Sequence, residues 1–99
     1  MEHPVGPILR MCDEVELVVE AIRDDNPGRE IEVIDRGSYV RVQADGYLRV
    51  TEASLQKYLG KGFLIRSLES MLSSFAGRID TAGDQIEWKL ISSPNASGR

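Results

Sequence analysis

The sequence has very few of the residues that bind metals or form covalent cross-links. Its 99 residues include one cysteine, Cys12, and one histidine, His3. These two side chains cannot supply the four ligands of a structural zinc site or the cysteine ligands of an iron–sulfur cluster, and no disulfide can form within the chain. We therefore expect no metal and no other cofactor, and the low cysteine content fits a reducing, cytoplasmic compartment.

An excess of positive charge and long apolar runs are also missing. The 12 Lys and Arg residues against 16 Asp and Glu residues give a formal net charge of −4, which leaves no surplus of positive charge to neutralise phosphates. No apolar run approaches the roughly 20 residues that span a bilayer, and the first residues lack the basic and then apolar pattern of a signal peptide. We therefore expect a soluble protein with neither nucleic acid nor membrane as a partner.

Apolar residues are present in sufficient number for one core. Hydrophobic residues make up 41% of the chain, and 99 residues suit one domain. We predict a single domain over residues 1–91, in which residues 1–4 are mobile. Residues 92–99 consist mostly of Ser, Pro, Asn and Gly and are predicted to form a disordered tail.

The first quarter of the chain indicates a strand followed by a helix. Residues 4–9 are apolar but contain two prolines, which favours an edge strand or an extended arm over a central strand. A capping residue, Asp13, then precedes apolar side chains with the spacing of one helix face. These are Val15, Val18, Val19 and Ile22. The helix has an acidic outer face and is predicted to end at residues 26–28.

Alternating apolar residues then indicate three strands. Residues 30–34 and 39–44 form two half-buried antiparallel strands, with Ile31 and Val33 on one face of the first. The pair Asp45–Gly46 is a preferred two-residue hairpin turn, and residues 47–50 resume the alternation. The sequence thus predicts a hairpin centred on this turn.

The second half indicates two helices and two further strands. Thr51 is predicted to cap a short helix that Gly60 ends, and a second helix is predicted over residues 64–72. Strands at 75–79 and 85–90 follow, with a turn between them and the apolar side chains of the second strand on one face. The elements therefore describe a strand-helix-strand-strand unit that occurs twice. The expected fold class is α+β, with helices packed on antiparallel sheets.

Residues suited to catalysis are scarce. His3 lies in a stretch expected to be mobile, whereas a general base must be held within hydrogen-bond reach of its target. Cys12 is next to two carboxylates that oppose thiolate formation, so we expect a buried or half-buried structural thiol. The segment 60–62 contains two glycines but lacks the spacing of a phosphate-binding loop. This pattern favours a binding protein over an enzyme.

Seven short segments occur in order between Val5 and Leu90 and together resemble one family. They are Val5–Arg10, Val15–Glu16 together with Val18–Glu20, Asp25–Ile31, Asp35–Arg36, Tyr39–Val42, Ser74–Ile79 and Asp84–Ile86. The chain resembles the effector proteins, also called coupling or regulatory proteins, of soluble bacterial multicomponent diiron monooxygenases. The resemblance is greatest to the effectors of four-component toluene and alkene monooxygenases.

The resemblance implies a non-catalytic, cofactor-free protein that acts on an enzyme. Such a protein binds the large subunit of the diiron hydroxylase near its active site. It couples electron transfer and O2 activation to hydroxylation or epoxidation of an aromatic or alkene hydrocarbon. The resemblance also allows competition with the ferredoxin or the reductase for the same surface.

The candidate contacts with the hydroxylase come from four segments. They are Val5, Gly6, Pro7, Ile8, Asn26, Pro27, Gly28, Tyr39, Arg41, Gln43, Ser74, Phe75, Ala76 and Gly77. Each segment also has a purely structural interpretation. Glycines and prolines can serve turn geometry, the first segment can complete a sheet edge, and the polar side chains of residues 39–43 can form a solvated face. Met71, Leu72, Phe75 and Trp88 are expected in the core.

A second function class stays open at this point. Strand-helix-strand-strand repeats also build small regulatory domains that bind a metabolite. Such a domain binds its ligand when alone, whereas an effector needs its protein partner. A metabolite-binding screen of the isolated protein therefore distinguishes the two hypotheses.

Overall fold

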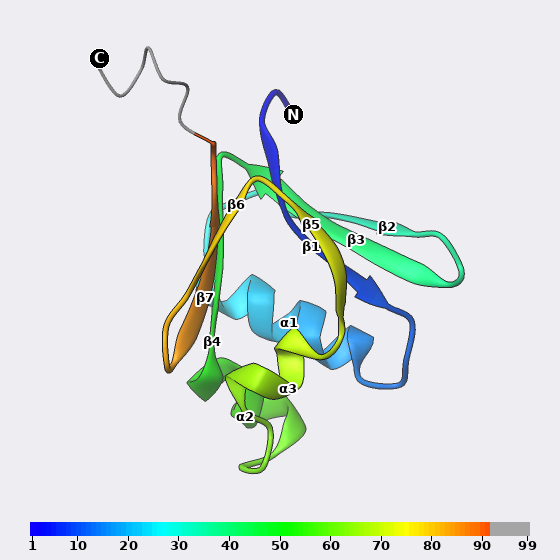
Figure 1. Cartoon of the computed structure of the whole chain (residues 1–99), viewed down its shortest axis with the longest axis vertical. Coiled ribbons are helices and arrows are strands. Elements are labelled where there is room, and N and C mark those ends of the chain that lie inside the picture. Colours follow the sequence, from blue (N-terminus) through cyan, green and yellow to red (C-terminus); the bar gives the residue numbers. More distant parts are fainter. Residues whose placement is uncertain (92–99) are drawn as a thin grey trace.

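Two antiparallel sheets and three helices make up residues 1–91, the part of the chain that the structure, a computed structural model, describes (Figure 1). The elements are β1 (Pro4–Arg10), α1 (Val15–Asp25), β2 (Glu32–Asp35), β3 (Tyr39–Asp45), β4 (Tyr47–Thr51), α2 (Glu52–Leu59), α3 (Ile65–Glu69), β5 (Leu72–Ala76), β6 (Arg78–Thr81) and β7 (Gln85–Lys89). The sheets have the strand orders β2-β3-β1-β5 and β4-β7-β6. The α+β class with antiparallel sheets is confirmed, and the predicted tail at 92–99 lies outside the described residues.

Helix α1 follows the apolar periodicity of the sequence. The four side chains of the predicted helix face, at positions 15, 18, 19 and 22, are buried, and Figure 1 shows the helix between the two diverging sheets. The predicted cap at Asp13 is wrong, because the helix begins one residue later, after Glu14, and no side chain caps it. Helix α2 begins where predicted, since Thr51 Oγ1 accepts a hydrogen bond from the Ser54 amide at 3.1 Å.

Strand β1 occupies a central position, contrary to the prediction of an edge strand or arm. It pairs with β3 on one side and with β5 on the other. The β1–β3 register runs from Val5 opposite Ala44 to Ile8 opposite Arg41 without partners for the two residues between. Pro7 lies in that gap, so its missing N–H costs no ladder bond to β3.

The predicted hairpin at Asp45–Gly46 is wrong. Strand β3 already has β2 on one edge and β1 on the other, so neither edge is open to β4. The single residue Gly46 instead leads the chain out of the four-stranded sheet and into the three-stranded one, where β4 pairs with β7. The Gly46 amide donates to the His3 carbonyl at 2.8 Å.

The predicted strand at 75–79 is two strands, which belong to different sheets. Strand β5 ends at Ala76 and β6 begins at Arg78, and the chain turns sharply at Gly77 between them. The helix predicted over 64–72 is shorter, because Leu72 already begins β5. The antiparallel pair β6–β7 is confirmed. Because residues 75–79 belong to two strands, the second unit of the predicted repeat contains one strand more than the first.

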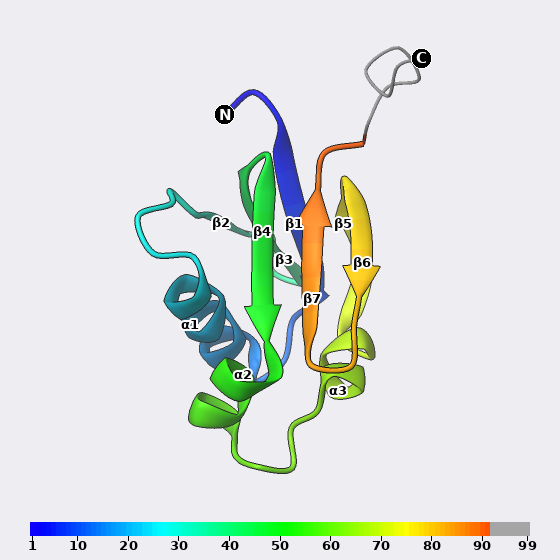
Figure 2. The same cartoon turned by 90° about the vertical axis from the view of Figure 1, so that its left-hand side faces the viewer.

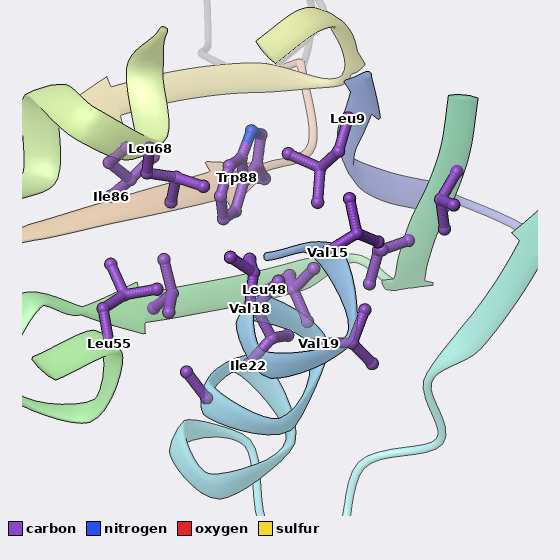
Figure 3. Packing of buried hydrophobic residues seen from close by; sticks show 14 of the residues in the cluster. Leu9, Val15, Val18, Val19, Ile22, Leu48, Leu55, Leu68, Ile86 and Trp88 are labelled. Atoms are coloured by element: carbon purple, nitrogen blue, oxygen red, sulfur yellow. The ribbon is translucent and has the colours of Figure 1, made fainter. Parts of the chain in front are cut away.

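The core lies between α1 and the two sheets. Trp88 is fully buried, and Figure 3 shows it in the middle of the cluster, with Leu9 and Leu68 nearby. Two expectations about burial are wrong, because Cys12 is exposed and Phe75 is exposed to 40%. Val33 and Leu90, which alternation placed on the apolar faces of their strands, are exposed to 39% and 44%.

None of the helices within residues 1–91 is long and apolar enough to cross a membrane.

Candidate docking surface

One face of the four-stranded sheet carries no helix. The strand register aligns Ile34, Arg41, Ile8 and Ser74 in a row across all four strands. Because side chains alternate along a strand, this row points away from Val33 and Val40, the residues that face α1. We call the helix-free side the outer face. It consists of Ile8, Arg10, Glu32, Ile34, Tyr39, Arg41, Gln43 and Ser74.

The outer face combines half-buried apolar groups with available positive charge. Ile8, Ile34 and Tyr39 are half-buried. Arg41 is half-buried as well and has no ion pair among the residues that the structure describes. Arg10 donates to the Ser70 carbonyl. Aromatic and arginine side chains, here Tyr39, Arg10 and Arg41, are types that protein interfaces favour.

Five of the predicted contact residues lie on this one face. They are Ile8, Tyr39, Arg41, Gln43 and Ser74. Gln43 is only 9% exposed, and its amide donates to Glu32 Oε1 at 2.6 Å. Its side chain therefore links β3 to β2 and offers little surface to a partner. The register thus brings together residues that lie up to 66 positions apart in the sequence (8 to 74).

The remaining predicted contact residues divide into buried and peripheral ones. Val5, Gly6 and Pro7 are buried within the sheet, so they offer little surface to a partner. Ala76 and Gly77 are half-buried where the chain changes sheets, and Pro27 and Gly28 are exposed in the turn after α1. Phe75, the peripheral candidate with the largest apolar side chain, is exposed on β5 at the margin of the sheet.

Asn26 has a structural role that the sequence did not reveal. It is 6% exposed, and its amide nitrogen donates to the carbonyls of Ile22 at 2.6 Å and Arg49 at 2.7 Å. Its amide oxygen accepts from the Arg49 backbone N–H at 3.1 Å. Asn26 therefore fastens the end of α1 to β4. No pattern in the sequence indicated the role of Asp25 either, whose carboxylate accepts from the Thr51 amide at 2.7 Å and from Ser54 Oγ at 2.7 Å.

The three-stranded sheet carries a polar network on the side opposite its buried residues. Tyr47 Oη donates to Glu87 Oε2 at 2.6 Å, and Lys89 lies 3.2 Å from Asp80 and 3.5 Å from Glu87. The hydrogen bond from Tyr47 is the main reason that the pKa of Glu87 lies below its ordinary value, and Lys89 adds to the effect. These groups already have partners within the chain.

Replacing Tyr47 by phenylalanine is expected to raise the pKa of Glu87. The Glu87 carboxylate contributes stability above its unfolded-state pKa, and this contribution is lost as the pH falls through its lower folded-state value. NMR titration of the Glu87 carboxyl in wild type and Tyr47→Phe measures the change. The matched control is Tyr58→Phe, which removes a hydrogen bond that lowers the pKa of Asp24 and should leave Glu87 unchanged. Equal Glu87 titrations in wild type and Tyr47→Phe would contradict the assignment.

The described residues contain no group of three or more His, Cys, Asp or Glu side chains placed to hold a metal ion. The outer face of the four-stranded sheet offers apolar and basic side chains for contact with a partner. These features define the chain as a small α+β protein with a face suited to docking another protein.

The chain belongs to the MmoB/DmpM family, whose match spans residues 3–89. It is 40% identical over 87 residues to the effector subunit of the alkene monooxygenase system of Xanthobacter autotrophicus Py2, covering 88% of this chain and 86% of that subunit. The resemblance seen in the sequence is thereby confirmed.

Solved structures share the fold. A chain in the structure of the phenol hydroxylase–regulatory protein complex matches with a TM-score of 0.76 at 21% identity, covering 90% of this chain and 100% of the other. The soluble methane monooxygenase regulatory protein B matches with a TM-score of 0.66 at 26% identity, covering 87% of this chain and 64% of that one.

Proposed function

We propose that this chain is the effector of a multicomponent diiron monooxygenase. It binds the large subunit of the hydroxylase near the diiron centre and couples electron transfer and O2 activation to hydroxylation or epoxidation of an aromatic or alkene hydrocarbon. It performs no chemistry itself and acts in the cytoplasm. The observation that carries the proposal is the 40% identity, over most of both chains, to an effector subunit of an alkene monooxygenase system.

Regulation by such a protein requires unequal affinities. An effector shifts the hydroxylase towards one conformation only if it binds that conformation more tightly than the other. A standard interface uses about 800 Å² per partner, and the described chain exposes 5698 Å². One face of this protein therefore provides enough area to dock the hydroxylase, and we assign the docking role to the outer face. Competition with the ferredoxin or the reductase for the same hydroxylase surface is consistent with this assignment.

Titration into a reconstituted system tests the function. The hydroxylase, its ferredoxin and its reductase are assayed while product and consumed NADH are both counted. We expect the product rate and the product per NADH to rise and to saturate near one effector per active site. If neither changes with hydroxylases of the toluene and alkene types, the proposal fails. A metabolite-binding screen of the isolated protein then tests the small-ligand sensor alternative.

Replacing Arg41 by glutamate is expected to raise the effector concentration for half-maximal activation about 10-fold, because it reverses the unpaired charge of the outer face. Saturating effector should still give the wild-type product per NADH. The matched control is Arg66→Glu, which makes the same charge change at an exposed position on α3 and should shift the titration less than 2-fold. Wild-type behaviour of Arg41→Glu would remove the outer face as the docking site.

A further inference from the structure

A second surface lies on the opposite side of the same sheet. A groove of about 660 Å³ runs between α1 and the strands β2 and β3. Figures 1 and 2 both show β2 above the helix. Its floor contains the buried residues Val15, Val19 and Val40. Three large apolar side chains line it while remaining open to solvent. They are Met11, Leu17 and Val33, which are exposed to 42%, 40% and 39%.

These exposed side chains line the same groove. The large exposed apolar side chains of the described residues number seven, and three of them line this groove. Isolated exposed apolar residues are ordinary, whereas a concave group of them is typical of a binding surface. The apolar lining therefore predicts an occupant that buries an apolar face of its own.

The charges around the groove restrict the occupant further. Its charged lining consists of Asp13, Glu16, Glu20, Asp35 and Arg23, four acidic groups and one basic group. Within residues 1–91 none of the five takes part in an ion pair. Unpaired carboxylates around an apolar floor complement a partner that is apolar on one side and basic at its margins.

We propose that this groove binds a basic amphipathic helix of the hydroxylase. The inference rests on the proposed function, which makes the hydroxylase the partner. A helix with its side chains is about 10 Å across and rises 5.4 Å per turn, so a groove of this volume accepts one face of roughly two turns. Apolar residues of the helix contact Leu17 and Val33, and its Lys or Arg residues face Glu16 and Glu20. This is the helix-in-groove mode of recognition.

Charge argues against a second copy of this chain as the occupant. The protein has a formal net charge of −4, so the overall field of another copy opposes its approach to an acidic groove. Only the outer face of that copy, which carries Arg10 and Arg41, would complement the groove. The outer face and the groove lie on opposite sides of β3. A hydroxylase that bound both the outer face and the groove would contact the β2–β3 pair from both sides of the sheet.

The test compares two double variants with the same change in net charge. Glu16→Lys/Glu20→Lys reverses two charges of the groove, and Glu30→Lys/Asp84→Lys reverses two exposed charges outside it. Calorimetric titration of each into the hydroxylase, at low and at high salt, gives Kd. We expect the groove variant to bind about 10-fold more weakly at low salt, with a flatter salt dependence, and the control to stay within 3-fold of wild type. Far-ultraviolet circular dichroism of both variants verifies the fold.

A photo-crosslinking residue at position 17 identifies the occupant directly. A crosslink to a Lys- and Arg-rich helix of the hydroxylase supports the proposal. A crosslink to a second effector chain or to residues 92–99 of the same chain overturns it. So does unchanged binding of Glu16→Lys/Glu20→Lys while wild type binds and activates. If wild type itself neither binds nor activates the hydroxylase, the proposed function has failed, which the wild-type titration shows separately.

Discussion

Replacing Gly6 by alanine is expected to destabilise the fold by about 4 kcal/mol or more. A Cβ atom at this position would lie 2.0 Å from the Val42 carbonyl oxygen and 3.0 Å from Leu48 Cδ2, and the residue has a φ of +147°. Strand β1 cannot move away from the Val42 carbonyl, because it is paired with β3 on one side and with β5 on the other. Such a loss is a large share of the 5–15 kcal/mol that stabilises an ordinary domain.

Urea unfolding followed through Trp88 fluorescence measures this loss. Trp88 is the single tryptophan and is fully buried, so its emission reports the opening of the core. The matched control is Gly83→Ala, where a Cβ atom would meet nothing within 4 Å, and we expect a change below about 0.5 kcal/mol. Equal unfolding midpoints for Gly6→Ala and Gly83→Ala would contradict the close approach of β1 to β3.

Close backbone packing also explains why some segments that carry the family resemblance contain glycine. At Gly77 a Cβ atom would lie 2.5 Å from the Lys89 carbonyl oxygen and 2.7 Å from Val5 Cγ1. The chain changes sheets there, and only a residue without a side chain fits. A recognisable motif therefore does not by itself identify a docking residue, because Gly6 and Gly77 each have a sufficient structural reason.

Local patterns in the sequence predicted most elements of the fold. The 3.6-residue periodicity located α1, Thr51 and Gly60 located the ends of α2, and alternation identified the buried faces of β3 and β4. Each of these features depends on residues close together in the chain. The class and the elements followed from them, with errors of a few residues at the boundaries.

Strand partners were not predictable in the same way. Asp45–Gly46 is a good hairpin turn by local chemistry, but a turn forms a hairpin only if the flanking strands have free edges. Whether β1 occupies an edge of β3 depends on contacts between residues 29 to 41 positions apart in the chain. The prolines of β1 likewise argued for an edge strand, and only the observed register shows how a central strand accommodates Pro7.

The outer face was only partly predictable, because local alternation gives the direction of a side chain but not the register between strands. Alternation placed Tyr39 and Arg41 away from the core, and the structure keeps them at the surface. Their alignment with Ile8 and Ser74 required the register of four strands. The groove beside α1 required the tertiary placement of β2, so no local pattern indicated it.

Replacing Asn26 by aspartate is expected to cost about 3 kcal/mol at pH 7. The change is nearly isosteric, but it removes the N–H groups that donate to the Ile22 and Arg49 carbonyls and puts a carboxylate against both oxygens. Burial and these carbonyls would raise the pKa of the new carboxyl group above its unfolded value. A raised folded-state pKa means that the loss is smallest below the unfolded pKa of about 4 and grows as the pH rises.

Urea unfolding of Asn26→Asp and wild type at pH 7 and pH 4 tests both the size and the sign of this effect. The matched control is Gln85→Glu, which also exchanges an amide for a carboxylate. Gln85 Oε1 accepts a hydrogen bond from Arg49 at 3.4 Å, and a carboxylate retains that acceptor. We therefore expect the control to change stability by less than about 0.5 kcal/mol at either pH. A cost for Asn26→Asp that is small, or that does not diminish at pH 4, would mean that the Asn26 amide does not fasten α1 to β4.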